Sequence, residues 1–166
     1  TSDYLVVVVA ANSPIRNISD FAERMRVNPK DVPIAGGSAG GVDHVFAGVF
    51  TRGSRSKPEE LVYLPFAGGA EVVQAVLSGK AAVGISGYSE FSDQLASGKL
   101  RAIGVSSKRS VFGIPAIREQ GVDVSAYATE AFDRLFLYGG TLIGGTNAGA
   151  YKYDNGSGTF TGLTGT

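Results

Sequence analysis

Apolar residues in the first three quarters of the chain alternate between short continuous runs and helical spacings. Residues 4–10 form an unbroken, largely β-branched run, which is typical of a strand buried on both faces. After a turn, Asn17 is placed to cap a helix whose apolar positions include Phe21 and Met25, with Asp20 as a favourable first-turn acid. The chain therefore starts with a strand followed by a helix.

The same alternation continues to about residue 126. We expect further strands at 32–35, 61–66, 81–86 and 100–106. Helices are expected at 42–51, 70–77, 89–96 and 115–120, several of them closed by a glycine. Alternation of this kind predicts an α/β fold with a doubly wound, mostly parallel sheet.

Residues 127–166 differ in character from the rest of the chain. Glycine and threonine dominate, charges become sparse, and no helical period continues beyond Phe132. Short strands are expected at 135–138, 141–145, 150–153 and 159–163, with glycine-containing turns between them. Two interpretations of this β-rich Gly/Thr tail stay open: an added β-meander, or a flexible end that does not fold alone.

Composition narrows the possible function classes. The chain has 166 residues, the length of one ordinary domain, and a formal net charge of zero. A neutral balance argues against a nucleic-acid binder, and the absence of cysteine excludes disulfides, zinc–thiolate sites and a cysteine nucleophile. The longest apolar run, residues 4–11, is too short to span a bilayer and lacks the flanks of a signal peptide.

Glycine-rich turns follow three of the expected strands. Glycine lets the backbone approach a ligand closely, and the helix start that follows offers unpaired N–H groups with a partial positive charge. Each turn is therefore a candidate site for an oxyanion such as a carboxylate. The candidate ligand-binding residues are Gly36, Gly37, Ser38, Ala39, Gly40 and Gly41 in the first turn, Ala67, Gly68 and Gly69 in the second, and Gly87 and Tyr88 at the rim.

Three polar residues near these turns favour structural roles. Asp43 is expected to cap the following helix or to anchor the loop, and His44, the only histidine, to be a hydrogen-bonded structural residue. Glu90 is expected to complement the dipole of its own helix, and it would repel a carboxylate unless it points away. The three do not form a metal-ligand spacing, so no metal site is predicted.

An enzyme interpretation also exists. Gly36 to Gly40 matches G-x-S-x-G, the nucleophile elbow of α/β-hydrolases, between a strand and a helix. That chemistry needs a histidine base from a separate, later loop, whereas His44 lies only six residues after Ser38, within the helix that follows the turn. A nucleotide-binding P-loop is disfavoured because no lysine follows the glycines. We therefore expect no catalysis and no cofactor.

Several ordered motifs resemble the substrate-binding proteins of tripartite tricarboxylate transporters, the TctC or Bug type. They are residues 1–9, 35–44, 65–69, 84–91, 97–102 and 117–123. The resemblance covers residues 1 to about 126 and corresponds to the second lobe of a two-lobed receptor of periplasmic-binding-protein type II. It implies that the first lobe is missing here, that the chain is a fragment or a fusion, and that residues 127–166 lie outside the family pattern. The tryptophan-containing crossover expected after residue 126 is absent.

The resemblance implies a function in transport. Such a receptor is periplasmic, closes on a small carboxylate and delivers it to membrane permease subunits. The alternatives are a truncated, non-binding scaffold, and a homo-oligomer formed through the exposed cleft face or the tail strands.

Overall fold

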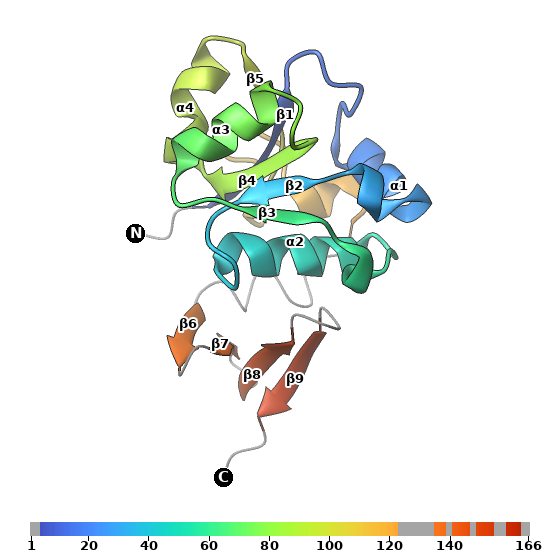
Figure 1. Cartoon of the computed structure of the whole chain (residues 1–166), viewed down its shortest axis with the longest axis vertical. Coiled ribbons are helices and arrows are strands. Elements are labelled where there is room, and N and C mark those ends of the chain that lie inside the picture. Colours follow the sequence, from blue (N-terminus) through green and yellow to red (C-terminus); the bar gives the residue numbers. More distant parts are fainter. Residues whose placement is uncertain (1–3, 123–134, 139–140, 147–148, 155–158, 164–166) are drawn as a thin grey trace.

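The computed structural model describes residues 4–122, 135–138, 141–146, 149–154 and 159–163. Its larger sheet has five strands in the order β3-β2-β4-β1-β5 (Figure 1). These strands are β1 (Leu5–Ala10), β2 (Ile34–Gly36), β3 (Tyr63–Pro65), β4 (Val83–Gly87) and β5 (Leu100–Val105). The helices are α1 (Ile18–Val27), α2 (Val42–Gly53), α3 (Gly69–Leu77) and α4 (Tyr88–Ala96), with short 3₁₀ turns at Pro29–Asp31, Pro58–Glu60 and Ile117–Gln120.

The direction of the strands confirms the expected fold class and adds one detail. β2 is parallel to both β3 and β4, whereas β1 is antiparallel to both β4 and β5. Four strands therefore run one way, and β1 runs against them inside the sheet. The continuous apolar run predicted burial on both faces correctly, since Val6 to Val9 are fully buried. It carries no information about strand direction.

Two layers of helices cover the sheet, as Figure 1 shows. On one face, α1 and α2 pack on Val7 and Val9, and the rings of Phe21 and Phe50 stack with centroids 4.3 Å apart. On the other face, α3 and α4 pack on Val6 and Val8. Burial of each large side chain contributes about 1.5–3 kcal/mol, so both layers are held mainly by apolar contact.

The helix boundaries follow local chemistry. Asn17 Oδ1 accepts a hydrogen bond from the Asp20 amide at 2.8 Å, which confirms the predicted cap of α1. Gly79 and Gly98, just beyond α3 and α4, have φ values of +81° and +75°, as predicted for glycines that end helices.

Arg101 on β5 fixes the connection between β1 and α1. Its guanidinium donates to the carbonyls of Ala11, Ser13 and Ile15 at 2.7–3.0 Å, while its buried Nε has no partner. One side chain thus replaces the regular backbone pairing that this loop lacks.

The second sheet is antiparallel, with the order β6-β7-β8-β9. Its strands are β6 (Leu135–Tyr138), β7 (Thr141–Thr146), β8 (Gly149–Asp154) and β9 (Thr159–Leu163). All four expected tail strands are present, two of them slightly longer than expected. Residues 127–134, which stand where the resemblance implies a tryptophan-containing crossover, lie outside the described part of the chain. Within that described part, no helix is long and apolar enough to cross a membrane.

Candidate functional site

The three glycine turns meet at one edge of the larger sheet. β2, β3 and β4 are adjacent and run in the same direction, so their carboxyl ends lie together. The chain leaves β2 toward α2 on one face of the sheet, but leaves β3 and β4 toward helices on the other face. Open α/β sheets bind ligands at such a switch point, because the diverging connections leave a crevice there.

Asp43 anchors the first turn. Its Oδ2 accepts a hydrogen bond from the Gly37 amide at 2.9 Å, and its carboxylate also accepts one from the Ser86 hydroxyl of β4. The N-cap of α2 is Gly41, with no side-chain cap. Of the two roles expected for Asp43, the structure shows the anchoring one.

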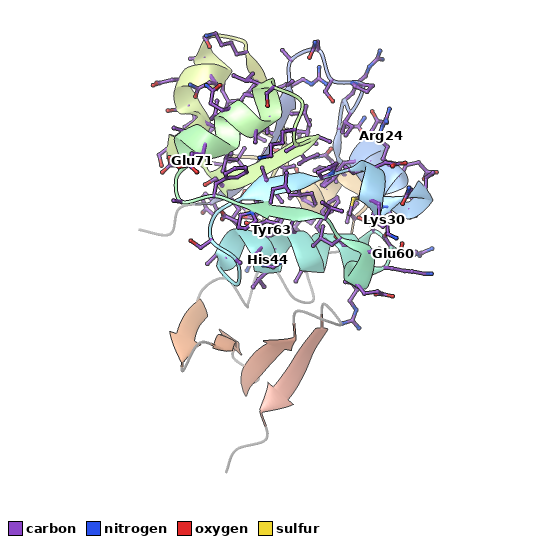
Figure 2. The ribbon with its side chains drawn as sticks, viewed as in Figure 1. Arg24, Lys30, His44, Glu60, Tyr63 and Glu71 are labelled. Atoms are coloured by element: carbon purple, nitrogen blue, oxygen red, sulfur yellow. The ribbon has the colours of Figure 1, made fainter. Side chains whose placement is uncertain are left out.

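His44 and Tyr63 hold the other side of the same turn. His44 Nδ1 accepts from the Gly40 amide at 2.9 Å, and the ring stacks on Tyr63 with centroids 4.1 Å apart. The Tyr63 hydroxyl donates to the Gly37 carbonyl at 2.7 Å. Figure 2 shows the two labelled side chains together beside the turn that leads into α2. The hydrogen bond expected for His44 is therefore present, and it joins His44 to the first turn.

Burial sets the protonation of this cluster. It raises the pKa of Asp43, an effect that the Glu90 charge reinforces and that the hydrogen bonds from Gly37 and Ser86 oppose. Burial also lowers the pKa of His44, which fits a neutral ring whose Nδ1 is an acceptor. Burial, followed by the Asp43 charge, raises the pKa of Tyr63, so its hydroxyl stays a donor.

Three glycines of the first turn disfavour a larger residue, two through lack of space and one through its backbone conformation. A Cβ on Gly36 would collide with the Tyr63 hydroxyl and lie 3.0 Å from Asp43 Cβ and 3.1 Å from the Ile85 carbonyl oxygen. A Cβ on Gly41 would lie 2.9 Å from the Ser38 carbonyl oxygen. Gly40 has open space but a φ of +79°, which L side chains rarely adopt. The glycines are therefore required by the fold of the turn.

The internal hydrogen bonds divide the amides of the first turn into two groups. The amides of Gly37 and Gly40 are used by side chains, and that of Gly41 donates to the Ser38 carbonyl at 2.9 Å. Among the described residues, no acceptor faces the amides of Ser38 and Ala39, both exposed, or the first-turn amides of α2. Not all six predicted residues thus offer an amide: Ser38 and Ala39, backed by the α2 terminus, are the available donors.

In the second turn, a side chain from another helix lies against the glycines. Ala67 and Gly68 are exposed, and a Cβ on Gly68 would meet nothing within 4 Å. A Cβ on Gly69, however, would collide with the Glu90 carboxylate and lie 2.7 Å from Glu90 Cβ. Glu90 therefore lies against the first residue of α3, as well as in the first turn of its own helix. An acid at this position occupies the electropositive end of α3.

Gly87 and Tyr88, the residues predicted to line the rim, lie where β4 ends and α4 begins. Gly87 is the N-cap of α4 and Tyr88 is its first residue. The Tyr88 ring stacks on Phe112, with centroids 4.1 Å apart and planes 15° apart. Sequence reasoning missed Phe112 and the contributions of Tyr63 and Ser86. Gly113, after β5, is a residue type that favours turns, whereas nothing local marked Phe112, Tyr63 or Ser86.

The arrangement also bears on the enzyme interpretation. His44 Nδ1 accepts a hydrogen bond from the Gly40 amide, and its ring stacks on Tyr63. In this arrangement Nδ1 is not available as a base for Ser38, which weakens the hydrolase interpretation. Among the described residues, no group of three His, Asp or Glu side chains is placed to hold a metal ion.

The fold matches solved solute-binding proteins. A TctC solute-binding protein from Polaromonas aligns with a TM-score of 0.65 and 22% identity, over 73% of this chain and 41% of that one. MatC from Rhodopseudomonas palustris, solved with malate, aligns with a TM-score of 0.65 and 18% identity, over 74% and 42%. A further R. palustris protein, solved with adipate, aligns with a TM-score of 0.64 and 21% identity, over 73% and 40%.

These likenesses establish the fold, and the chain spans about two fifths of the length of the proteins it matches. No curated protein matches it. The family model described as the tripartite tricarboxylate transporter family receptor matches residues 1–132, six residues beyond the expected end of the resemblance. The chain belongs to this family of transport receptors.

Proposed function

We propose that this chain binds one carboxylate of a small organic acid at the first glycine turn, as the second lobe of a TctC-type receptor. The observation that carries the proposal is the unpaired, exposed amide pair of Ser38 and Ala39, held at the switch point by Asp43, His44 and Tyr63. A turn that is already ordered loses little conformational freedom when a ligand binds.

Neutral donors suit a receptor that must also release its ligand. Amide N–H groups recognise a carboxylate without a permanent counter-charge, and the Ser38 hydroxyl adds another neutral donor. The nearby charges are acidic, because Asp43 lies behind the turn and Glu90 lies against Gly69. The proposed ligand therefore presents one carboxylate to the first turn, and a second carboxylate at Ala67–Gly69 requires Glu90 to move.

Family membership supports the transport role. Related structures hold malate and adipate, both small carboxylates. We extend this to a periplasmic receptor lobe that works with membrane permease subunits and performs no catalysis. The domain division into residues 1–126 and 127–166 remains part of the proposal.

An NMR titration tests the site. Adipate added to the ¹⁵N-labelled 166-residue chain is expected to shift the Ser38 and Ala39 amides saturably. Gly40→Val is the test variant, because Gly40 has open space but a φ of +79°, so valine distorts the turn without entering the core. Gly98→Val is the matched control, with a φ of +75° and equally open space beyond α4.

Comparing the two variants separates the effect of a distorted first turn on binding from the effect of backbone strain elsewhere in the chain. We expect Gly40→Val to weaken adipate binding about tenfold or more, and Gly98→Val to leave it within about twofold, since 1.4 kcal/mol corresponds to a factor of ten. Equal binding by both variants contradicts the first-turn site. Covalent labelling of Ser38 by a serine-directed phosphonate would instead favour the hydrolase interpretation.

A further inference from the structure

Glu90 lies beside the end of β2, the strand that leads into the first glycine turn. In the larger sheet, β2 lies between β3 and β4. α3 follows β3 and α4 follows β4, and both helices pack on the face of the sheet opposite to α2. Glu90 in the first turn of α4 lies against Gly69 at the start of α3, so it joins the two connections that flank β2. Because the first turn leaves β2 toward α2, it and Glu90 lie on opposite sides of the switch point.

The second turn is fixed directly to the first. Gly36 at the end of β2 is in register with Pro65 of β3, and the Phe66 amide donates to the Gly36 carbonyl at 2.9 Å. Neighbouring strands lie about 4.8 Å apart, so the two turns leave the sheet side by side. Gly69, against which Glu90 lies, follows Phe66 within the same turn. Only a short stretch of backbone therefore separates the Glu90 carboxylate from the first turn.

The first turn is also joined to β4, through Asp43. The Asp43 carboxylate accepts a hydrogen bond from the Gly37 amide at 2.9 Å and another from the Ser86 hydroxyl of β4. Burial raises the pKa of Asp43, and the charge of Glu90 raises it further. Coulomb energies decline only gradually with distance, so a charge that acts on Asp43 also acts on an anion held by the amides that follow Gly37.

The Glu90 carboxylate has free acceptor oxygens. Within the described residues, Glu90 is exposed and has neither an ion-pair nor a hydrogen-bond partner. It stands at the amino-terminal ends of α3 and α4, where a partial positive charge attracts anions. A carboxylate of the chain itself therefore occupies the place that suits a second carboxylate of a ligand. A hydroxyl or ammonium group of a ligand, in contrast, finds hydrogen-bond acceptors there.

We propose that Glu90 is a specificity-determining residue, which adapts this chain to a monocarboxylate whose far end carries a hydrogen-bond donor. This rests on the proposed function, because the carboxylate of that ligand binds to the Ser38 and Ala39 amides. At the far end, a hydrogen bond from the donor to the ionised Glu90 is stronger than one between neutral groups. A second ionised carboxylate has no proton to donate and meets a like charge instead. Adipate therefore binds less tightly than an acid of the same length that ends in a donor.

The test compares three acids of equal length that differ only at the far end. Adipate ends in a second carboxylate, 6-hydroxyhexanoate in a hydroxyl and 6-aminohexanoate in an ammonium group. Each is titrated into the ¹⁵N-labelled full chain at about pH 8, where both carboxylates of adipate are ionised, with the Ser38 and Ala39 amide shifts as the readout. Glu90→Gln removes the charge and keeps the shape. Glu71→Gln is the matched control, since Glu71 is also an exposed acid in the first turn of its helix, α3.

The order of the three affinities decides the outcome. We expect the parent chain and Glu71→Gln to bind 6-hydroxyhexanoate and 6-aminohexanoate about two- to fivefold more tightly than adipate at low salt. In Glu90→Gln, the three affinities should agree within about twofold. Equal binding of the three acids by the parent chain overturns this inference and leaves the proposed function intact. A preference that survives in Glu90→Gln, or that Glu71→Gln loses to the same extent, also overturns it. Absence of a saturable shift with all three acids removes the proposed function as well.

Discussion

The first and second glycine turns look alike in sequence but are built differently. In the first turn, three side chains hold the backbone by hydrogen bonds. Asp43 and His44 accept from the amides of Gly37 and Gly40, and the Tyr63 hydroxyl donates to the Gly37 carbonyl. In the second, Gly68 has open space and Gly69 accommodates an acid from a neighbouring helix. The first turn is therefore ordered before any ligand arrives, whereas the second already carries a negative charge. Two turns of similar glycine content thus differ in chemistry: the first is the proposed hydrogen-bond donor site, and the second has the Glu90 carboxylate beside it.

The largest effect is expected from filling the first turn. Gly36→Ala places a methyl group against the Tyr63 hydroxyl, Asp43 Cβ and the Ile85 carbonyl oxygen. Overpacking of this kind costs about 1–3 kcal/mol, because little around it can move. Urea unfolding measures the loss. Gly68→Ala is the matched control in the second turn, where nothing lies within 4 Å, and we expect it to cost under about 1 kcal/mol. Equal losses would remove the contrast between the turns.

Acid should loosen the first turn through His44. Because burial lowers the pKa of His44 in the folded chain, its stabilising contribution is complete above the ordinary value of 6.5 and is lost as pH falls below it. A protonated ring cannot accept the Gly40 amide, a loss of about 1 kcal/mol. His44→Phe keeps the stack on Tyr63 but should show no such fall in unfolding free energy.

The stabilising contribution of Asp43 changes with pH in the opposite direction to that of His44, and over a lower pH range. Its pKa is raised, so its contribution is greatest below the ordinary value of 3.8 and declines as pH rises through the folded-state value. The free energies of unfolding of Asp43→Asn and of the parent chain, measured from pH 3 to pH 8, separate the pH dependence due to Asp43 from that due to His44. A parent curve identical to that of His44→Phe would show that the histidine does not hold the loop.

A smaller effect is expected from the hydroxyl of Tyr63. Tyr63→Phe keeps the stacked ring but removes the donor to the Gly37 carbonyl, at a cost of about 0.5–1 kcal/mol. Hydrogen exchange of the Ser38 and Ala39 amides should quicken, and adipate affinity should fall modestly. Unchanged exchange would mean that Asp43 and His44 suffice to order the turn.

The smallest effect concerns the second turn. Glu90→Gln removes the negative charge beside Gly69, and we expect adipate to bind about two- to fivefold more tightly at low salt, with the gain shrinking as salt is added. Glu71→Gln is the control, since it removes the same charge from an exposed position in the first turn of α3 (Glu71 is labelled in Figure 2). Glu71 lines a groove with Phe66 and Lys80. Equal gains in both variants would indicate a general charge effect.

Sequence patterns predicted much of the fold because they depend on local chemistry. Local sequence alone predicts the strand at Val6 to Val9, the helix start at Asn17 and the end of α3 at the following glycine, with no information from distant residues. The reversed direction of β1 could not be predicted in this way, since a strand buried on both faces has the same apolar run in either direction.

The candidate site was predictable only in part for a similar reason. The glycines were visible, and so were Asp43 and His44, which accept hydrogen bonds from two of their amides, but the other residues that hold the turn come from distant strands. Tyr63 reaches Gly37 because β3 pairs with β2 in the register Ile34 to Tyr63, and Ser86 reaches Asp43 from β4. Such pairings depend on tertiary register, which no local pattern in this chain specifies.

The reversed direction of β1 has a practical consequence. Because β1 runs against its neighbours, Leu5 begins the strand at the same edge as the glycine turns, next to Gly87. Tyr4, 41% exposed, therefore offers an attachment point beside the proposed ligand rather than at the far side of the lobe. A small environment-sensitive dye placed there through Tyr4→Cys, in a chain that has no other cysteine, would turn this lobe into an optical reporter of what occupies its edge.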